Sequence, residues 1–135
     1  MNYFLKTLCI VAICLLPFIL SACSDDDEVK GDKYYVKYEI TVGDWTGTQA
    51  RKNIWSIGCK TESGTASFNV EGQTSWEASY GPFQKGDIVS LSVYCTMAKR
   101  QINPRIYVCK GGDAYILKAS ATNVTSASLK YEIDF

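Results

Sequence analysis

The sequence predicts an all-β fold, a small antiparallel β-sandwich of about seven or eight strands. Three observations support this prediction. Apolar and polar residues alternate with a period of two near both ends of the segment 33–135, shorter apolar runs between them are separated by turn residues, and helical periodicity is missing from this segment. Since strand spacing does not give the order of strands in a sheet, a partly closed barrel remains the alternative.

The first and the last predicted strands are the clearest. The first follows Lys33 and has on one face Tyr34, Val36, Tyr38, Ile40 and Val42. The last is at the C-terminus and has on one face Leu129, Tyr131, Ile133 and Phe135. Mostly charged residues occupy the positions between them, which is the pattern of a strand with one face against a core.

Shorter strand candidates lie between these two. They cover about residues 51–59, 64–71, 73–80, 86–97, 104–110 and 113–119. They are separated by Gly43-Asp44, Ser63-Gly64, Glu71-Gly72, Lys85-Gly86, Asn103-Pro104 and Gly111-Gly112-Asp113. These residues tolerate a positive φ or preset a turn, so neighbouring strands have turns to join them.

The predicted domain contains three cysteines, Cys59, Cys95 and Cys109. Alternation places Cys59 on the inward face with Trp55 and places Cys95 inward as well. The two could meet across packed sheets in a disulfide, as in immunoglobulin domains, and a pair of buried free thiols is an equal alternative. Cys109 alternates with Val108 and is predicted to face outward.

The N-terminus predicts export. Lys6 precedes an apolar run that ends at Leu20, too short to cross a bilayer. The next residues, Leu20-Ser21-Ala22-Cys23, resemble the lipobox of bacterial lipoproteins. This resemblance implies that residues 1–22 are a cleaved lipoprotein signal peptide and that Cys23 is lipidated. An ordinary cleavage site followed by a chance cysteine is the alternative.

Residues 23–32 predict a short disordered tether, because Ser24-Asp25-Asp26-Asp27-Glu28 offers no apolar area to bury. This run resembles the export signal of surface-exposed lipoproteins in the Bacteroidota. It implies a cell envelope protein, lipid-anchored to the outer membrane and facing outward. A solvated linker that faces the periplasm is the alternative. Residues 33–135 then form one β-sandwich domain.

The order of several short motifs resembles the immunoglobulin-like extracytoplasmic domain of MmpS-type membrane accessory proteins. The motifs are Tyr38-Glu39-Ile40-Thr41, Trp76, Gly86-Asp87-Ile88-Val89-Ser90-Leu91, Ile106-Tyr107-Val108 and Gly111-Gly112. The resemblance implies an immunoglobulin-like sandwich, and it implies a transporter as a partner. The chain departs from that family in its lipid anchor and its cysteine positions.

The composition argues against catalysis. The chain has no histidine, the usual general base near neutral pH, and it has no P-loop, dinucleotide fingerprint or CxxC pair. Glu77 and Asp87 are the carboxylates that could pair for glycoside hydrolysis, but both occupy positions typical of solvated charges. We therefore predict no enzyme, no metal and no cofactor, and the weak, scattered charge predicts no nucleic-acid partner.

Aromatic residues in predicted loops are the candidates for ligand binding. Trp45 lies in a turn-rich segment, and Tyr80 and Phe83 lie in Tyr80-Gly81-Pro82-Phe83. A non-catalytic binding module for a glycan or another ligand requires these rings to be exposed; for Trp45, a plug at one end of the sandwich is an equal alternative. The second hypothesis is an accessory subunit that docks on another envelope protein or a transporter, through an apolar patch or an open edge strand.

Overall fold

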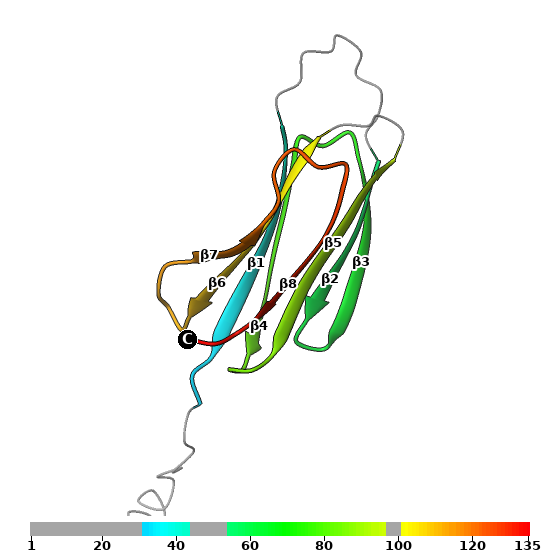
Figure 1. Cartoon of the computed structure of the whole chain (residues 1–135). Helices are drawn as coiled ribbons and strands as arrows, with labels where there is room; N and C mark the ends of the chain where they lie inside the picture. The colour runs from blue at the N-terminus through cyan, green and yellow to red at the C-terminus, as the bar shows by residue number, and fades with distance from the viewer. Residues whose placement is uncertain (1–30, 44–53, 97–100) are drawn as a thin grey trace, which may run out of the picture. The chain divides into compact units, whose positions relative to one another are not determined.

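The computed structural model describes residues 31–43, 54–96 and 101–135. In these ranges the chain forms strands and no helix. The described residues therefore contain no helix long and apolar enough to cross a membrane. The strands are β1 (Tyr34–Val42), β2 (Ile54–Thr61), β3 (Gly64–Glu71), β4 (Ser75–Phe83), β5 (Ile88–Thr96), β6 (Ile102–Lys110), β7 (Ile116–Ser120) and β8 (Ser126–Glu132) (Figure 1). Their bounds lie close to the predicted ones.

The strands form two four-stranded antiparallel sheets. The first sheet has the order β4-β1-β6-β7 and the second has the order β3-β2-β5-β8. The predicted antiparallel sandwich is therefore confirmed. Immunoglobulin domains keep their first two strands in one sheet, whereas here β1 and β2 lie in opposite sheets, so the strand order of this sandwich is different.

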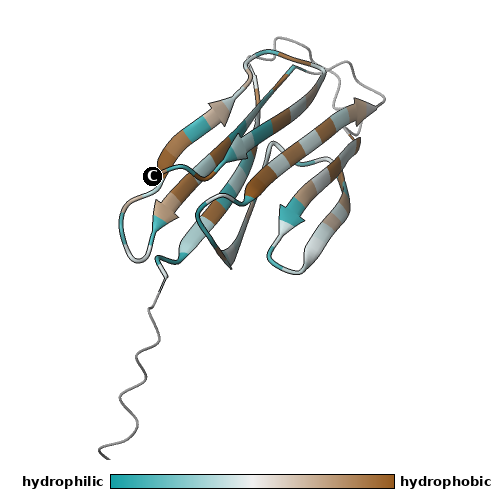
Figure 2. Ribbon diagram, turned by 60° about the horizontal axis from the view of Figure 1, so that its bottom comes forward, coloured by the Kyte–Doolittle hydropathy of each residue, from teal (hydrophilic) through white to brown (hydrophobic). Residues whose placement is uncertain are grey.

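Alternation along the strands builds a single core between the sheets. Bands of hydrophobic and hydrophilic residues follow one another along the strands in Figure 2. The inward positions that are fully buried include Tyr34, Val36, Tyr38 and Ile40 of β1, Trp55 of β2, Val89 and Leu91 of β5, and Ile102, Ile106 and Val108 of β6. Burying each of these side chains contributes roughly 1.5 to 3 kcal/mol to stability.

Two buried tyrosines use their hydroxyl groups to join distant segments. Tyr38 in β1 donates to the backbone carbonyl of Lys60 in β2, at 2.6 Å, and so links the two sheets. Tyr34 donates to the carbonyl of Phe135, which brings the C-terminus to the end of the sandwich where β1 begins (Figure 1). Burial raises the pKa of Tyr38 above its ordinary value, so the phenol stays protonated.

Of the two alternatives for Cys59 and Cys95, the disulfide is wrong, and the structure has both as buried cysteines outside any disulfide. Both residues are buried, as their inward positions predicted, but β2 and β5 are neighbours in the same sheet. Cys59 lies opposite Leu91 and Cys95 lies opposite Trp55. The two cysteines are thus four residues apart along the strands, about 13 Å, whereas a disulfide requires Cα atoms within roughly 7 Å of each other.

The prediction of an exposed thiol at Cys109 is also wrong. Cys109 is on the outward side of β6 by alternation, opposite Tyr35 of β1, yet only 4% of its surface is exposed. The turn after β6 folds back over it, and its Sγ lies 3.9 Å from the carbonyl oxygen of Gly111. Alternation predicts the direction of a side chain, and the neighbouring turn decides whether solvent reaches it.

Candidate functional site

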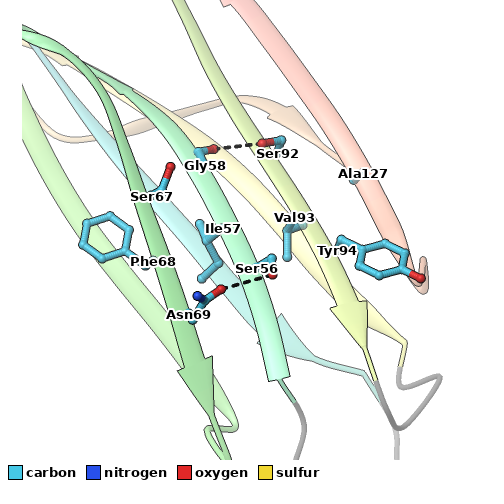
Figure 3. Close-up of a pocket in the computed structure, with 10 residues that line it drawn as sticks. All are labelled: Ser56, Ile57, Gly58, Ser67, Phe68, Asn69, Ser92, Val93, Tyr94 and Ala127. Atoms are coloured by element: carbon cyan, nitrogen blue, oxygen red, sulfur yellow. Dashed lines mark hydrogen bonds between the residues drawn. The ribbon is translucent and has the colours of Figure 1, made fainter.

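An open groove of about 510 Å³ lies on the outer face of the second sheet (Figure 3). It crosses β3, β2 and β5 and reaches β8. The side chains that give it its polar character are Ser56, Ser67, Asn69, Ser92 and Tyr94. Among the residues that line this groove, none carries a charge.

A glycine forms the floor of the groove. Gly58 of β2 lies opposite Ser67 of β3 on one side and Ser92 of β5 on the other. Because glycine and serine are small, this row of outward residues leaves a hollow in the sheet surface. A Cβ atom added at Gly58 would lie 2.8 Å from the Oγ of Ser92, so any larger residue would fill the hollow.

Hydrogen bonds within the groove orient several of its polar groups. The Ser92 hydroxyl donates to the carbonyl oxygen of Gly58 at 3.3 Å, and the Ser56 hydroxyl donates to the Asn69 Oδ1 at 3.2 Å (Figure 3). A hydroxyl that donates keeps lone pairs for a ligand, and the Asn69 amide nitrogen keeps its donors. The groove therefore offers both donors and acceptors.

Tyr94 supplies an aromatic surface beside these groups. It lies in β5 opposite Ser56, with its ring on the β8 side of the groove (Figure 3). The side chain is unusually open for an aromatic residue in a sheet, with 58% of the residue exposed. An exposed ring next to hydroxyl and amide groups can stack on one face of a ligand while the polar groups bind its edge.

The aromatic candidates predicted from the sequence lie elsewhere. Trp45 is outside the described residues, and its role stays a prediction. Phe83 is 3% exposed and belongs to the core, so its predicted ligand contact is wrong. Tyr80 is half-buried against the core, with its ring centroid 6.1 Å from that of Tyr38. Both described residues are in β4, in the other sheet from the groove.

A bulge in β4 explains why both rings turn inward. Tyr34 pairs with Phe83 and Val36 pairs with Tyr80, so β4 uses one more residue than β1 over the same stretch. The extra residue reverses the alternation between Tyr80 and Phe83. This backbone path requires a glycine at position 81. Its φ is +152°, and an added Cβ would lie 2.9 Å from the Tyr34 carbonyl oxygen, which leaves no room for a side chain.

The Cys59 thiol and the carboxylates of Glu77 and Asp87 lie in three different elements: β2, β4 and the turn before β5. Burial raises the pKa of Cys59, an effect that its hydrogen bond to Tyr80 only partly offsets, so the reactive thiolate is disfavoured. Asp87 closes the turn before β5 by accepting the backbone N–H of Gln84 at 2.8 Å. Glu77 lies exposed in β4, opposite Glu39. Within the described ranges, no group of three or more potential ligand residues could hold a metal ion.

The outer face of the first sheet has a different character. Arg105 and Glu39 form an ion pair at 3.2 Å, and the Tyr107 hydroxyl donates to the same carboxylate at 3.3 Å. Hydrogen bonds with Tyr107 and Glu39 raise the pKa of Arg105. The Lys37 ammonium lies 4.6 Å from the ring centroid of Tyr107 and 5.2 Å from that of Tyr115. Lys37, Glu39 and Arg105 thus all have partners on this face.

Comparisons with known proteins return nothing that resembles the chain: no protein-family model, no curated protein and no solved structure matches it. The residues of the groove therefore carry the functional argument. The sequence contains one signal that points to this groove, a recurrence of Ser, Gly and Asn at alternate positions of strands 54–61, 64–71 and 88–96. Only the pairing of these strands brings them into one surface.

Proposed function

We propose that this protein is a non-catalytic binding module of the bacterial cell envelope, lipid-anchored through Cys23, which binds a neutral glycan in the groove of the second sheet. The observation that carries the proposal is an uncharged, hydroxyl-lined hollow with the exposed ring of Tyr94 beside it. Lipid anchoring rests on the lipobox-like residues before Cys23.

The groove suits a sugar for chemical reasons. A hexose has an apolar C–H face that stacks on an aromatic ring, and a rim of hydroxyl groups that both donate and accept hydrogen bonds. A charged ligand would find no counter-ion among the lining residues, and an apolar ligand would displace the water that satisfies the remaining hydrogen-bonding capacity of Ser56, Ser92 and Asn69. A neutral, hydroxyl-rich ligand satisfies both conditions.

Affinity for one binding site is expected to be weak. A stacked ring and a few neutral hydrogen bonds contribute about 1 kcal/mol each, and the groove is shallow and open. This corresponds to dissociation constants on the order of 0.1 to 1 mM. Many copies anchored on one membrane would bind a polysaccharide with repeated units far more tightly through multivalency.

Docking as an accessory subunit by strand addition has less support. The edge strand with the most apolar exposure is β7, which has only five residues and a register shift where it pairs with β6. The Lys118 ammonium lies 3.8 Å from the ring centroid of Phe135, so this lysine folds across the edge. Short length, irregular pairing and lysine are the means by which natural edge strands avoid pairing with other chains.

The test is isothermal titration of the full-length protein, in a non-glycosidic detergent, with a panel of α-glucans, β-glucans and mannans. We expect Tyr94→Ala to weaken binding about tenfold, equivalent to roughly 1.4 kcal/mol. Gly58→Val fills the hollow, and a Ser92→Ala background removes the one atom that the added Cβ would meet, so the double variant should abolish binding. Ser92→Ala alone measures the part of the loss that its own hydroxyl causes, and Tyr107→Ala, on the other sheet, is the matched control.

Two results would reject the groove as the glycan site. One is a folded wild-type protein that binds no member of the panel. The other is binding that survives both groove variants; if Trp45→Ala then abolishes it, the site belongs to the segment around Trp45 instead.

A further inference from the structure

Three consecutive apolar residues are exposed where the chain enters β7. Tyr115, Ile116 and Leu117 are 38%, 50% and 47% exposed, and we call them the β7 patch. Figure 2 shows the hydrophobic start of this strand beside the C-terminus. Large apolar residues that are exposed together in one short segment commonly mark a site of interaction.

The β7 patch lies at the end of the sandwich where the chain enters the domain. Two contacts fix this position: Lys110 pairs with Asp32 at 2.7 Å, and the N–H of Gly111 donates to the carbonyl of Lys33 at 2.7 Å. The turn that leads from β6 to the patch therefore touches the first described residues. An anchor on the chain before residue 31 would therefore be attached at this end of the domain.

A second exposed aliphatic residue lies at the same end. Ile88 begins β5 and is 57% exposed. The segment before it is joined to the C-terminal residues by two backbone hydrogen bonds, from Gly86 to the carbonyl of Ile133 and from Ile133 to the carbonyl of Asp87. Apolar exposure among the described residues is thus concentrated at the tethered end, apart from Tyr94 in the groove.

We infer that this end of the sandwich rests on the lipid bilayer, with Tyr115, Ile116 and Leu117 in its interfacial layer. The inference rests on the proposed lipid anchor. Only eight peptide units separate Cys23 from Gly31, which span at most about 28 Å when fully extended. An acylated Cys23 would therefore keep this end of the domain, and with it the β7 patch, close to the membrane surface.

The composition of this end suits a membrane interface. Tyrosine is enriched at the level of lipid head groups, where its ring is in an apolar layer and its hydroxyl in a polar one. Lys110 and Lys118 flank the patch, the first paired with Asp32 and the second against the Phe135 ring. At a bilayer, lysine side chains of this kind can turn their charged ends toward phosphate. Tyr94 lies at the other end of β5 from Ile88, so this orientation leaves the groove away from the bilayer.

The test is depth-dependent fluorescence quenching of the full-length protein in phosphatidylethanolamine and phosphatidylglycerol vesicles that contain brominated phosphatidylcholine. Leu117→Trp places a reporter in the β7 patch. Ser126→Trp places one at the start of β8, which is the opposite end of the domain. We expect quenching of the Leu117→Trp protein to exceed the wild-type baseline at least twofold, and quenching of the Ser126→Trp protein to equal it.

Tyr115→Trp is a second reporter if Leu117→Trp fails to fold. Equal quenching at the two ends would overturn the inference. Protection of Leu117→Trp from an aqueous quencher in intact cells, without quenching in vesicles, would also overturn it, because a protein partner would then cover the patch.

Mass spectrometry of the N-terminal peptide separates this inference from the proposed anchor. An acylated Cys23 with an unquenched Leu117→Trp reporter rejects the membrane orientation alone. An unmodified N-terminus rejects the anchor and removes the basis of the orientation.

Discussion

The outer faces of the two sheets follow the same alternation but differ in chemistry. On the first sheet, Lys37, Glu39, Arg105 and Tyr107 pair among themselves. On the second sheet, short hydroxyl side chains surround Gly58 and leave a hollow. Charged groups that already pair with one another offer less binding capacity, whereas short neutral groups leave both space and hydrogen-bonding capacity for a ligand.

The largest expected difference concerns one glycine from each sheet. Gly81→Ala forces a Cβ to within 2.6 Å of the Tyr35 ring at a positive φ, and it should lower the free energy of unfolding by about 2 to 4 kcal/mol. Gly58→Ala meets only the Ser92 hydroxyl, which can rotate, and should cost less than about 1 kcal/mol. Urea denaturation followed by circular dichroism measures both. Equal losses would contradict the different roles of the two glycines.

The next effect compares the interior with the outer face of the first sheet. Tyr38→Phe leaves the Lys60 carbonyl without its buried donor and should cost about 1 to 2 kcal/mol. Tyr107→Phe removes a hydrogen bond to a partly exposed carboxylate and should cost no more than about 0.5 kcal/mol. Thermal unfolding of both variants tests the order. A larger loss for Tyr107→Phe would make the outer network the more important of the two.

The ion pair of the first sheet should contribute little by itself. Glu39→Gln is expected to cost less than about 1 kcal/mol, because the Arg105 and Glu39 side chains are 38% and 21% exposed and the pair is screened. The loss should shrink as salt rises from 0.05 to about 0.5 M. Ser56→Ala on the second sheet is the neutral control, whose stability should not depend on salt. A salt-independent loss would indicate that the network acts through packing.

The smallest effect appears only at alkaline pH. Burial and a hydrogen bond to Asp134 raise the pKa of Tyr131 to about 12. Because the folded pKa lies above the ordinary 10.0, this contribution is complete below pH 10 and is lost as the pH rises through about 12. The free energy of unfolding should therefore fall over this range, and Tyr131→Phe should make the fall shallower. An unchanged slope would reject this assignment.

The strands were predictable because alternation is local. Side chains of successive strand residues point to opposite faces, so the inward set of β1, with Tyr38 at its centre, can be identified without knowing its neighbours. The prediction failed at Phe83, because β4 continues through a bulge into the segment expected to be a loop, and the disulfide alternative for Cys59 and Cys95 failed because their strands share a sheet. In both places the answer depends on which strand lies beside which.

The groove depends on the same nonlocal information. Ser56, Ser67 and Tyr94 come from three strands, and only their register makes them one surface. By itself the sequence determined the all-β class, the strand positions and the inward faces, since these follow from backbone geometry over a few residues. The tertiary structure alone decided the strand order, the burial of Phe83 and Cys109, and the existence of the groove. These features require contacts between segments far apart in the chain, and a local pattern does not contain them.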